Sequence, residues 1–427
     1  MDDQYDVLVI GAGPAGSSTA ILLARKGWRV ALIEKADFPR RKVCGECIAA
    51  SNMPLLDALG IGQAARDLAG PPLRHVALIF RDRMVRAELP SFNDRRHPWG
   101  YALGREGLDA LLLEQAGNAG AVVFCPWTVL TMEGAPGHMS CTIQEVQSRE
   151  TRILAAPIII SACGSWETHR GTNYTSSRES AMAAAKAGTR PSIHHDSDLF
   201  AFKANFSSTG LPNGLLPVLS FRGGYGGMVL EGRSLATLAF CIRRDTLAAC
   251  RHAKYGATAA QAALAYVRQA CREADLMLAG SERCGSWLSI GPIRPGVRLA
   301  QGNGSLFLVG NAAGEAHPII GEGISMALQG AWLLAEALLA QGPHARTSKE
   351  HQDRAQRGYM AAWRRAFVPR IRFAAAFAHI AMRPTLMGTV FPVLQRYPWL
   401  LTHAAAWSGK VDGSFWPRNQ ARYNAGS

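Results

Sequence analysis

Apolar and polar positions along the first 34 residues follow the order strand, helix, strand. Tyr5–Ile10 is a short run rich in Val and Ile, which is typical of a strand buried on both faces. Pro14–Lys26 repeats apolar side chains at helical spacing, and Gly27 ends that pattern before a second apolar run at Arg29–Glu34. This order predicts one βαβ unit at the start of the chain.

The middle of the chain changes character and predicts an antiparallel sheet. Four short runs, separated by Gly, Asn and Pro turns, follow one another: Phe200–Phe206, Leu215–Phe221, Gly227–Glu231 and Leu235–Ile242. Further along, Leu306–Val309 predicts another short buried strand, and Ile324–Leu339 predicts a long apolar helix.

These patterns predict an α/β fold, α+β overall, with a discontinuous nucleotide-binding domain. We assign residues 1–74, 100–165 and 285–345 to a Rossmann-like domain, and residues 75–99 and 166–284 to an inserted antiparallel-sheet domain for the substrate. Residues 346–427 are expected to form a helical C-terminal region. A chain of 427 residues is long enough for two or three such domains.

Basic residues are concentrated at the C-terminal end. The formal net charge is +14, and the segment from Arg354 onward carries eleven basic residues and one acidic residue, Asp412. A field of one sign attracts anionic partners, so an anionic membrane surface or an acidic carrier protein is expected here. The sequence contains no recognisable nucleic-acid-binding module, and nucleic acid is not expected as a partner.

The cysteines and the N-terminus bear on the compartment. The nine Cys are scattered, and Asp2 and Asp3 stand where an export signal would carry basic residues. This predicts reduced thiols in a cytoplasmic protein, to which the basic segment could add peripheral membrane association. No metal site is predicted.

The first chemical motif is Gly11-Ala12-Gly13-Pro14-Ala15-Gly16, between the first strand and the first helix. In such a motif the first glycine allows a tight turn, the second lets the backbone approach a pyrophosphate, and the third lets helix and strand pack closely. The helix N-terminus then presents unpaired N–H groups to the phosphates. Glu34 ends the second strand, where a carboxylate accepts ribose hydroxyls and repels a 2′-phosphate. The motif therefore predicts FAD or NAD rather than NADP.

The second motif is the glycine-rich run from Gly310 to Ile324, which also lies between a predicted strand and a predicted helix. Two glycine turns around Pro318 would let the backbone pass close to an extended ligand. From the residues alone, the run is either a second phosphate loop or a tight structural turn.

Taken together, the two motifs resemble the flavoprotein superfamily of aromatic hydroxylases, geranylgeranyl reductases and flavin-dependent halogenases, in which the late motif holds the flavin end of FAD. The geranylgeranyl-reductase-like branch is the most similar. Its basic-Cys-Gly-Glu loop matches Lys42-Val43-Cys44-Gly45-Glu46, its Gly-Glu-Gly-Ile run matches Gly321–Ile324, and Leu103-Gly104-Arg105 resembles the superfamily's FAD-contacting arginine helix.

The resemblance implies FAD as cofactor and NADPH or NADH as electron donor, used directly or through a reductase. With the motifs, it gives the expected cofactor-binding residues: Gly11, Gly13, Pro14, Ala15, Gly16, Glu34, Lys35, Lys42, Cys44, Gly45, Arg105, Gly310, Asn311, Ala312, Gly321, Gly323 and Ile324.

Three departures from the superfamily pattern matter. Asn311 stands where an Asp usually binds the ribityl chain, although an amide can still bond a hydroxyl. Ala162-Cys163-Gly164 replaces the hydroxylases' Asp-Gly pair, which argues against hydroxylase-style use of NADPH. None of the ten Trp residues has another Trp two positions away, so the halogenases' Trp-x-Trp pair is missing and halogenation is not favoured.

Cys44, His317 and Glu322 are the candidate catalytic residues, and each has a competing interpretation. Cys44 could act beside the flavin or, with Cys47, form a thioredoxin-like redox pair. His317 suits a general acid but also a turn before Pro318. Glu322 could be catalytic, but a carboxylate at a helix start is also favourable capping.

The sequence thus predicts an FAD-dependent oxidoreductase acting on a hydrophobic, lipid-like or carrier-bound substrate. The reaction would be hydroxylation, or C=C reduction or its reverse; the sequence does not decide between them. A non-catalytic flavin-binding protein that tethers to a membrane is the alternative of a different class.

Overall fold

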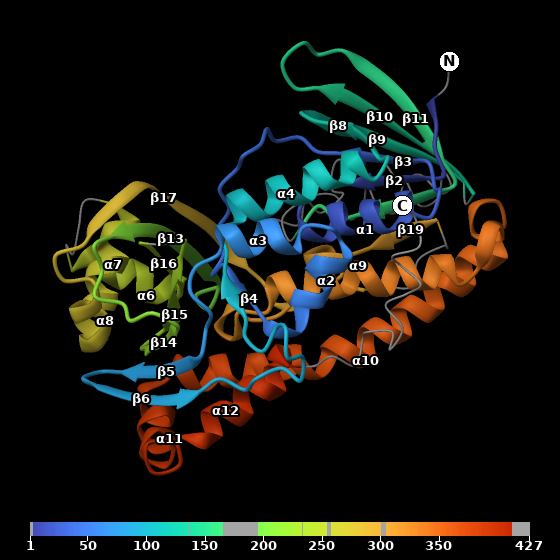
Figure 1. Ribbon diagram of the computed structural model, residues 1–427. Coiled ribbons are helices and arrows are strands. Elements are labelled where there is room, and N and C mark those ends of the chain that lie inside the picture. Colours follow the sequence, from blue (N-terminus) through green and yellow to red (C-terminus); the bar gives the residue numbers. More distant parts are fainter. Residues whose placement is uncertain are drawn as a thin grey trace.

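The computed structural model describes residues 3–135, 137–164, 195–232, 234–253, 258–299 and 305–411 (Figure 1). Its centre is a five-stranded parallel sheet with the strand order β19 (Leu306–Leu308), β12 (Ile158–Ser161), β2 (Val7–Ile10), β3 (Val30–Ile33) and β8 (Val122–Phe124). Because β12 and β19 are neighbours in space but not in sequence, the domain is discontinuous. The Rossmann-like architecture is confirmed.

Helices cover one face of this sheet. β2 leads into α1 (Pro14–Ala24), which packs between α4 (Arg105–Asn118) and α9 (Gly323–Leu339). Val7 and Val9 of β2 face these helices, as the two-residue repeat of a strand requires.

A four-stranded layer, antiparallel except for the parallel pair β1 and β11, covers the other face, where Leu8 and Ile10 are buried. Its strands are β1 (Asp3–Gln4), β11 (Thr151–Ala156), β10 (His138–Glu145) and β9 (Trp127–Ala135). The sequence analysis assigned no strands to this stretch, although Met139, Cys141 and Ile143 of β10 alternate regularly with polar residues.

The second large sheet has seven strands, in the order β17 (Glu282–Ile293), β13 (Leu199–Ser207), β16 (Leu235–Arg243), β15 (Gly224–Glu231), β14 (Leu215–Phe221), β5 (His75–Phe80) and β6 (Arg83–Glu88). All neighbouring strands are antiparallel except β14 and β5. The four strands predicted from residues 200–242 are all present. β17 extends the sheet past residue 285, where the sequence analysis placed a return to the nucleotide domain.

Helices pack on the face of this sheet that is remote from the nucleotide domain: α6 (Arg244–His252), α7 (Ala259–Ala270) and α8 (Arg272–Met277). Several short elements complete the fold: β4 (Cys47–Ile48), α2 (Met53–Ala58), α3 (Gly62–Leu68), β7 (Tyr101–Ala102), β18 (Gly296–Val297) and β20 (Gly314–Glu315). The opposite face of the seven-stranded sheet is turned toward the nucleotide domain.

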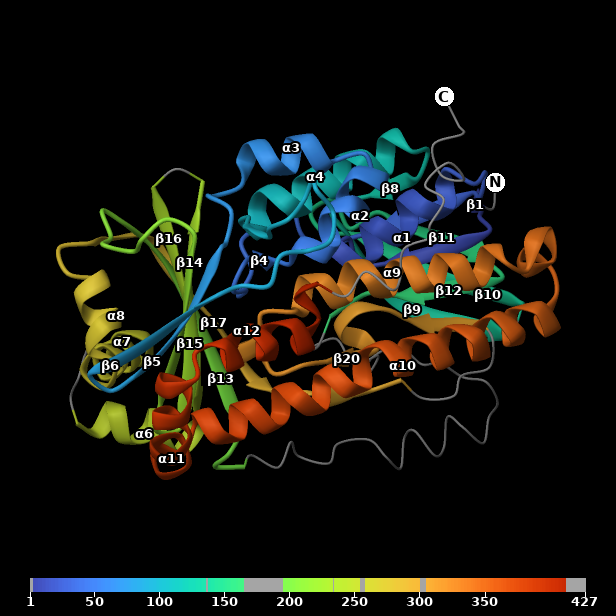
Figure 2. The same ribbon diagram turned by 60° about the horizontal axis from the view of Figure 1, so that its bottom comes forward.

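The C-terminal region is helical, as predicted. It consists of α10 (Lys349–Ala381), α11 (Pro384–Arg396), α12 (Trp399–Ala405) and a π-helical turn, Ala406–Lys410. Figure 2 shows α10 running beneath both domains, with α11 and α12 beside β5 and β6. No helix in the described part of the chain is both long and apolar enough to cross a bilayer.

Candidate active site

A cavity of about 850 Å³ lies where the nucleotide domain, the seven-stranded sheet and the C-terminal helices meet. Most of the predicted cofactor-binding residues line it: Gly11, Gly13, Pro14, Ala15, Glu34, Lys35, Lys42, Cys44, Gly45, Arg105, Gly310, Asn311, Gly321, Gly323 and Ile324. Gly16, Ala312, His317 and Glu322 lie behind its wall. The two motifs, some three hundred residues apart in sequence, thus border one cavity.

The first glycine motif has the shape that a dinucleotide requires. Gly11 has φ +102°, and a Cβ there would lie 2.6 Å from the carbonyl oxygen of Ala162. A Cβ at Gly16 would overlap the carbonyl oxygen of Gly11, so that glycine allows α1 to pack on β2. At both positions a side chain would collide with the protein's own backbone, whether or not a ligand is bound.

Gly13 differs, because the space in front of it is open. A Cβ there would have only two neighbours within 4 Å, Arg105 Nη2 at 3.8 Å and Arg40 Nη2 at 3.9 Å. A bare backbone at a helix N-terminus, faced by two guanidinium groups, suits a pyrophosphate. The cradle therefore fits FAD on the geometry of its own residues.

Acidic side chains hold these two arginines in place. Arg105 donates from Nε and Nη2 to the two oxygens of buried Asp109, both at 2.7 Å. Arg40 pairs with Glu34 Oε1 at 2.7 Å, and its Nε lies 3.6 Å from Asp109. The sequence analysis identified Glu34 and Arg105 as site residues but not this network of ion pairs. The only sign of the network in the sequence is the i, i+4 spacing of Arg105 and Asp109.

Glu34 also orders the motif itself. The N–H of Ala12 donates to Glu34 Oε2 at 2.8 Å, and the N–H of Ala36 donates to Oε1 at 3.0 Å. The carboxylate retains lone pairs for hydroxyl donors, since each of its oxygens can accept more than one hydrogen bond.

The late motif supplies a carboxylate that sequence reasoning missed. Asn311 Nδ2 donates to Glu315 Oε1 at 3.3 Å, and Arg298 Nη2 donates to Glu315 Oε2 at 3.1 Å. Glu315 lines the cavity beside Asn311. A carboxylate is therefore present near the position where the superfamily has Asp, but it comes from four residues further along.

The loop from Lys42 to Glu46 closes the cavity on another side. Burial raises the pKa of the Cys44 thiol, and the N–H of Glu46 donates to its sulfur at 3.3 Å. Burial also raises the pKa of Cys47, and neither cysteine is in a disulfide. Both side chains are therefore neutral thiols near pH 7, and this form does not favour thioredoxin-like chemistry.

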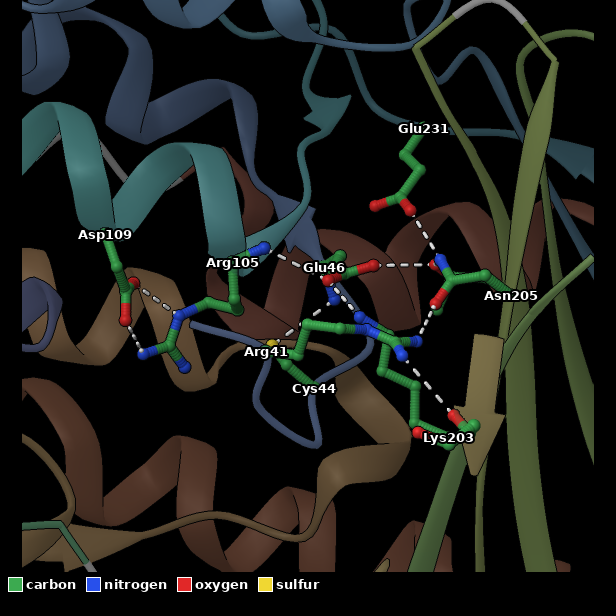
Figure 3. A network of polar contacts seen from close by, with 10 residues as sticks. Arg41, Cys44, Glu46, Arg105, Asp109, Lys203, Asn205 and Glu231 are labelled. Atoms are coloured by element: carbon green, nitrogen blue, oxygen red, sulfur yellow. Dashed lines mark hydrogen bonds and ion pairs between the residues drawn. The ribbon is translucent and has the colours of Figure 1, made fainter. Parts of the chain in front are cut away.

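Glu46 ties that loop to the seven-stranded sheet (Figure 3). Its carboxylate pairs with Lys203 of β13 and accepts a hydrogen bond from Thr237 Oγ1 of β16 at 2.6 Å. The N–H of Arg105 also donates to it, at 3.0 Å. Burial alone raises the pKa of Glu46, but the charge of Lys203 and hydrogen bonds with Glu231, Lys203 and Thr237 lower it below the ordinary value. Burial and the hydrogen bond to Glu46 raise the pKa of Glu231 to about 8, so near pH 7 Glu231 is mostly protonated.

His317 contacts the cavity only through a neighbour. Its Nδ1 lies 3.0 Å from the hydroxyl of Tyr225, a residue of β15 that lines the cavity. Burial lowers the pKa of His317 to about 4, and burial raises that of Tyr225. At neutral pH the pair consists of an uncharged imidazole and a phenol, which can exchange a proton with a bound molecule through the Tyr225 hydroxyl.

Glu322 is buried at the start of α9 and makes no capping hydrogen bond from its side chain. Its Oε1 instead pairs with Nζ of Lys410 at 3.0 Å. Simple capping is therefore not what this carboxylate does here.

Much of the remaining cavity wall is apolar. Strands of the large sheet and the C-terminal helices contribute Val76, Leu78, Phe202, Leu216, Val218, Met228, Phe240, Phe373, Phe377 and Leu401. An apolar cleft that continues from the cofactor cradle suits a hydrophobic molecule.

Residues 4–362 of the chain match the model of a protein family described as the FAD binding domain. The chain belongs to this family. The match covers the nucleotide domain and the seven-stranded sheet and ends within α10, so α11 and α12 lie outside it. The superfamily expected from the sequence is confirmed.

Curated relatives of this family member differ in activity. Menaquinone reductase of Mycolicibacterium smegmatis is 26% identical over 399 residues, which cover 91% of each chain. Conditioned medium factor receptor 1 of Dictyostelium discoideum is 27% identical over 79% of this chain and 64% of its own length, so the match spans less than two thirds of that relative. The 6-methylpretetramide 4-monooxygenase of Streptomyces rimosus is 44% identical over 61 residues, 14% of this chain and 15% of the relative.

Two solved structures share the fold. The myxobacterial chondrochloren halogenase has a TM-score of 0.72 and 18% identity, covering 99% of this chain and 96% of its own. A geranylgeranyl bacteriochlorophyll reductase-like protein of Thermoplasma acidophilum has a TM-score of 0.66 and 18% identity, covering 95% of this chain and all of its own. At such identities the likeness concerns the fold and not the reaction.

Proposed function

We propose that this protein is an FAD-dependent oxidoreductase that acts on a long hydrophobic substrate. The observation that carries the proposal is the single cavity that joins the dinucleotide cradle at Gly13 to the apolar cleft at Phe377 and Leu401. A substrate in that cleft would meet the reactive end of the cofactor away from water.

C=C reduction is the reaction that we favour. The menaquinone reductase match extends over nearly the whole chain, and the hydroxylases' Asp-Gly pair is replaced by Cys163 and Gly164. When bound, reduced FAD supplies a hydride to one carbon of a double bond. Tyr225, with His317 behind it, is placed to hold the proton that the second carbon needs. NADPH or NADH is the proposed source of electrons.

Hydroxylation is the second candidate, supported by the local match to a monooxygenase. Halogenation has only the shared fold in its favour, since the Trp-x-Trp pair is missing.

Anaerobic turnover with menaquinone-4 as the probe separates these reactions. For a reductase we expect reduced holoprotein to be reoxidised without O₂, and the product to stay two mass units heavier after air has returned any quinol to quinone. A hydroxylase would give no anaerobic product but would incorporate one atom from ¹⁸O₂. A protein that NADPH and NADH cannot reduce, and that converts the probe in neither way, would be a non-catalytic binding protein, contrary to our proposal.

A matched pair of variants tests the cleft itself. Ala405 lines the cavity, whereas Ala375 of α10 is exposed. Ala405→Trp should fill the apolar cleft and raise KM for the probe, while Ala375→Trp should leave KM unchanged. An equal effect of both changes would place the substrate elsewhere.

We further propose that α11 and α12 dock on an anionic membrane surface. Large apolar side chains are exposed on α12 and on the π-helical turn after it, including Trp399 at 55% and Trp407 at 75%, and Arg372 and Arg396 are exposed on α10 and α11. Aromatic residues mixed with charge of one sign suit a lipid interface. The cavity reaches α12, so a lipid-like substrate could enter from that surface.

One residue of the basic segment does not belong to this surface. Arg370 is only 4% exposed and donates from Nη1 to Gln329 Oε1 at 2.9 Å, so it is a core residue and cannot contact lipid. Arg418 and Arg422 lie outside the described residues.

Arg365, Arg372 and Arg396 changed together to Glu should weaken binding to anionic vesicles. The expected loss is about 1 kcal/mol for each side chain that reaches the surface, and it should shrink as salt rises. Cosedimentation with phosphatidylserine-containing and neutral vesicles measures it. Two single changes form a matched pair. Arg396→Glu should weaken the binding, whereas Arg149→Glu, far away on the β10–β11 turn, should leave it unchanged. Binding to an acidic carrier protein but to neither vesicle would contradict the membrane proposal.

A further inference from the structure

The π-helical turn after α12 carries a lysine back into the cofactor cavity. Ser51 Oγ donates to the carbonyl oxygen of Gly409 at 3.1 Å, and Gly409 has φ +103° with the Arg370 guanidinium packed against it. This anchored turn places Lys410 in the cavity wall, where it is only 8% exposed.

Three groups surround the Lys410 ammonium. Nζ lies 3.0 Å from Glu322 Oε1, 3.0 Å from the carbonyl oxygen of Ile320 and 3.8 Å from Cys47 Sγ. Burial alone lowers the pKa of Lys410, but its interactions with Cys47 and Glu322 raise it well above the ordinary value. Because Cys47 is a neutral thiol, Glu322 supplies the balancing charge, and Lys410 is a buried cation.

This is an unusual place for a cation. Lys410 lies at the N-terminus of α9, where the helix dipole favours negative charge and opposes positive charge. A buried ion pair seldom gains stability over apolar packing, because both charges lose their hydration. Glu322 Oε2 is buried without a hydrogen-bond partner among the described residues. One oxygen of the ion pair therefore has no hydrogen bond to compensate for its lost hydration. Stability alone does not account for this arrangement.

The position of Lys410 in the cavity suggests a use for its charge. Gly13 and Glu34 fix the dinucleotide end of the cradle, and the apolar cleft marks where substrate meets the reactive end. Gly321 and Gly323 line the same cavity at the start of α9, beside Lys410, and would hold the flavin end of a bound cofactor. Gly321, at φ +64°, has no side chain to cover the ammonium, which lies 3.7 Å from where its Cβ would be.

We propose that Lys410 sets the reduction potential of the bound FAD by placing a positive charge beside the end that gains electrons, with Glu322 as its opposing charge. The residue lies outside the part of the chain that matches the family, so this is a property of the C-terminal region of this protein. The proposal rests on FAD binding and not on the identity of the substrate.

Two single variants with opposite effects test it. Lys410→Met leaves the negative charge of Glu322, which opposes reduction, so the FAD midpoint potential should fall. Glu322→Gln leaves the positive charge of Lys410, so the potential should rise. We expect about a tenfold change in the reduction equilibrium each way, about 30 mV for two electrons. The double variant should return close to the wild-type value, since it removes both charges.

The measurement is a spectroscopic redox titration of the purified holoprotein, and it needs no substrate. Lys349→Met removes a lysine that is exposed at the start of α10 and should leave the potential unchanged. If Lys410→Met does not retain FAD, two other variants still test the proposal. Lys410→Arg should preserve the midpoint potential, and Glu322→Gln should raise it. Shifts of the same sign in Lys410→Met and Glu322→Gln, or no shift in either, would show that the pair only holds the turn in place.

Discussion

Gly13→Ala should remove FAD from the protein while leaving the fold intact. The fold itself tolerates a methyl group there, because no atom other than the ends of two arginine side chains comes within 4 Å. A pyrophosphate on the bare backbone would not tolerate it. We expect FAD affinity to fall at least about 100-fold, which corresponds to roughly 2.7 kcal/mol. Flavin content after purification and calorimetric titration of apoprotein with FAD measure the effect.

Gly16→Ala is the matched control in the same motif. Its added methyl group overlaps the carbonyl oxygen of Gly11 whether or not a ligand is bound, so this variant should lose thermal stability as apoprotein. Gly13→Ala should instead melt like wild-type apoprotein. Full FAD content in Gly13→Ala would mean that the cofactor does not approach the backbone at this turn.

Lys203→Met should destabilise the protein by about 3–5 kcal/mol, because it leaves the carboxylate of Glu46 buried without its cation. Glu46 is 1% exposed, and its remaining partners, which are Thr237, the backbone N–H of Arg105 and the side chain of Glu231, carry no positive charge. Urea unfolding of the holoprotein and apoprotein, followed by circular dichroism, gives the free energy of unfolding.

Lys203→Met combined with Glu46→Gln removes both charges and should regain a large part of this loss. Lys349→Met is the control for removing an exposed lysine and should change the free energy of unfolding by less than about 0.5 kcal/mol. A double variant no more stable than Lys203→Met would mean that packing, and not the ion pair, accounts for the loss.

The sequence was most informative where function depends on local backbone shape. The order of strand, glycine turn and helix located Gly11, Gly13 and Glu34, because each acts through residues within one βαβ unit. The antiparallel sheet was predictable because its strands are largely apolar runs separated by clear turns. The four-stranded layer behind the parallel sheet was missed because its strands are more polar, although Met139, Cys141 and Ile143 of β10 alternate with polar residues as a half-buried strand requires.

Partners that are distant in sequence could not be predicted. Lys203 meets Glu46 across 157 positions, and Lys410 meets Glu322 across 88. A single lysine in a strand or a tail carries no signal of such a partner. Arg370 was wrongly counted as surface charge for the same reason, because only the packing of α10 on α9 shows that it is buried.

The length of α10 limits how this protein can move. A helix of 33 residues spans roughly 50 Å. About a third of the way along the helix, Tyr359 donates from its hydroxyl to the carbonyl oxygen of Leu308 in β19, at 2.8 Å. At its C-terminal end the carbonyl oxygen of Ala381 accepts from Ser220 in β14, at 2.7 Å. The helix therefore braces one sheet against the other, and a hinge opening would break both attachments. Movement of α12, which lines the cavity with Leu401, Ala404 and Ala405, would instead leave both attachments intact.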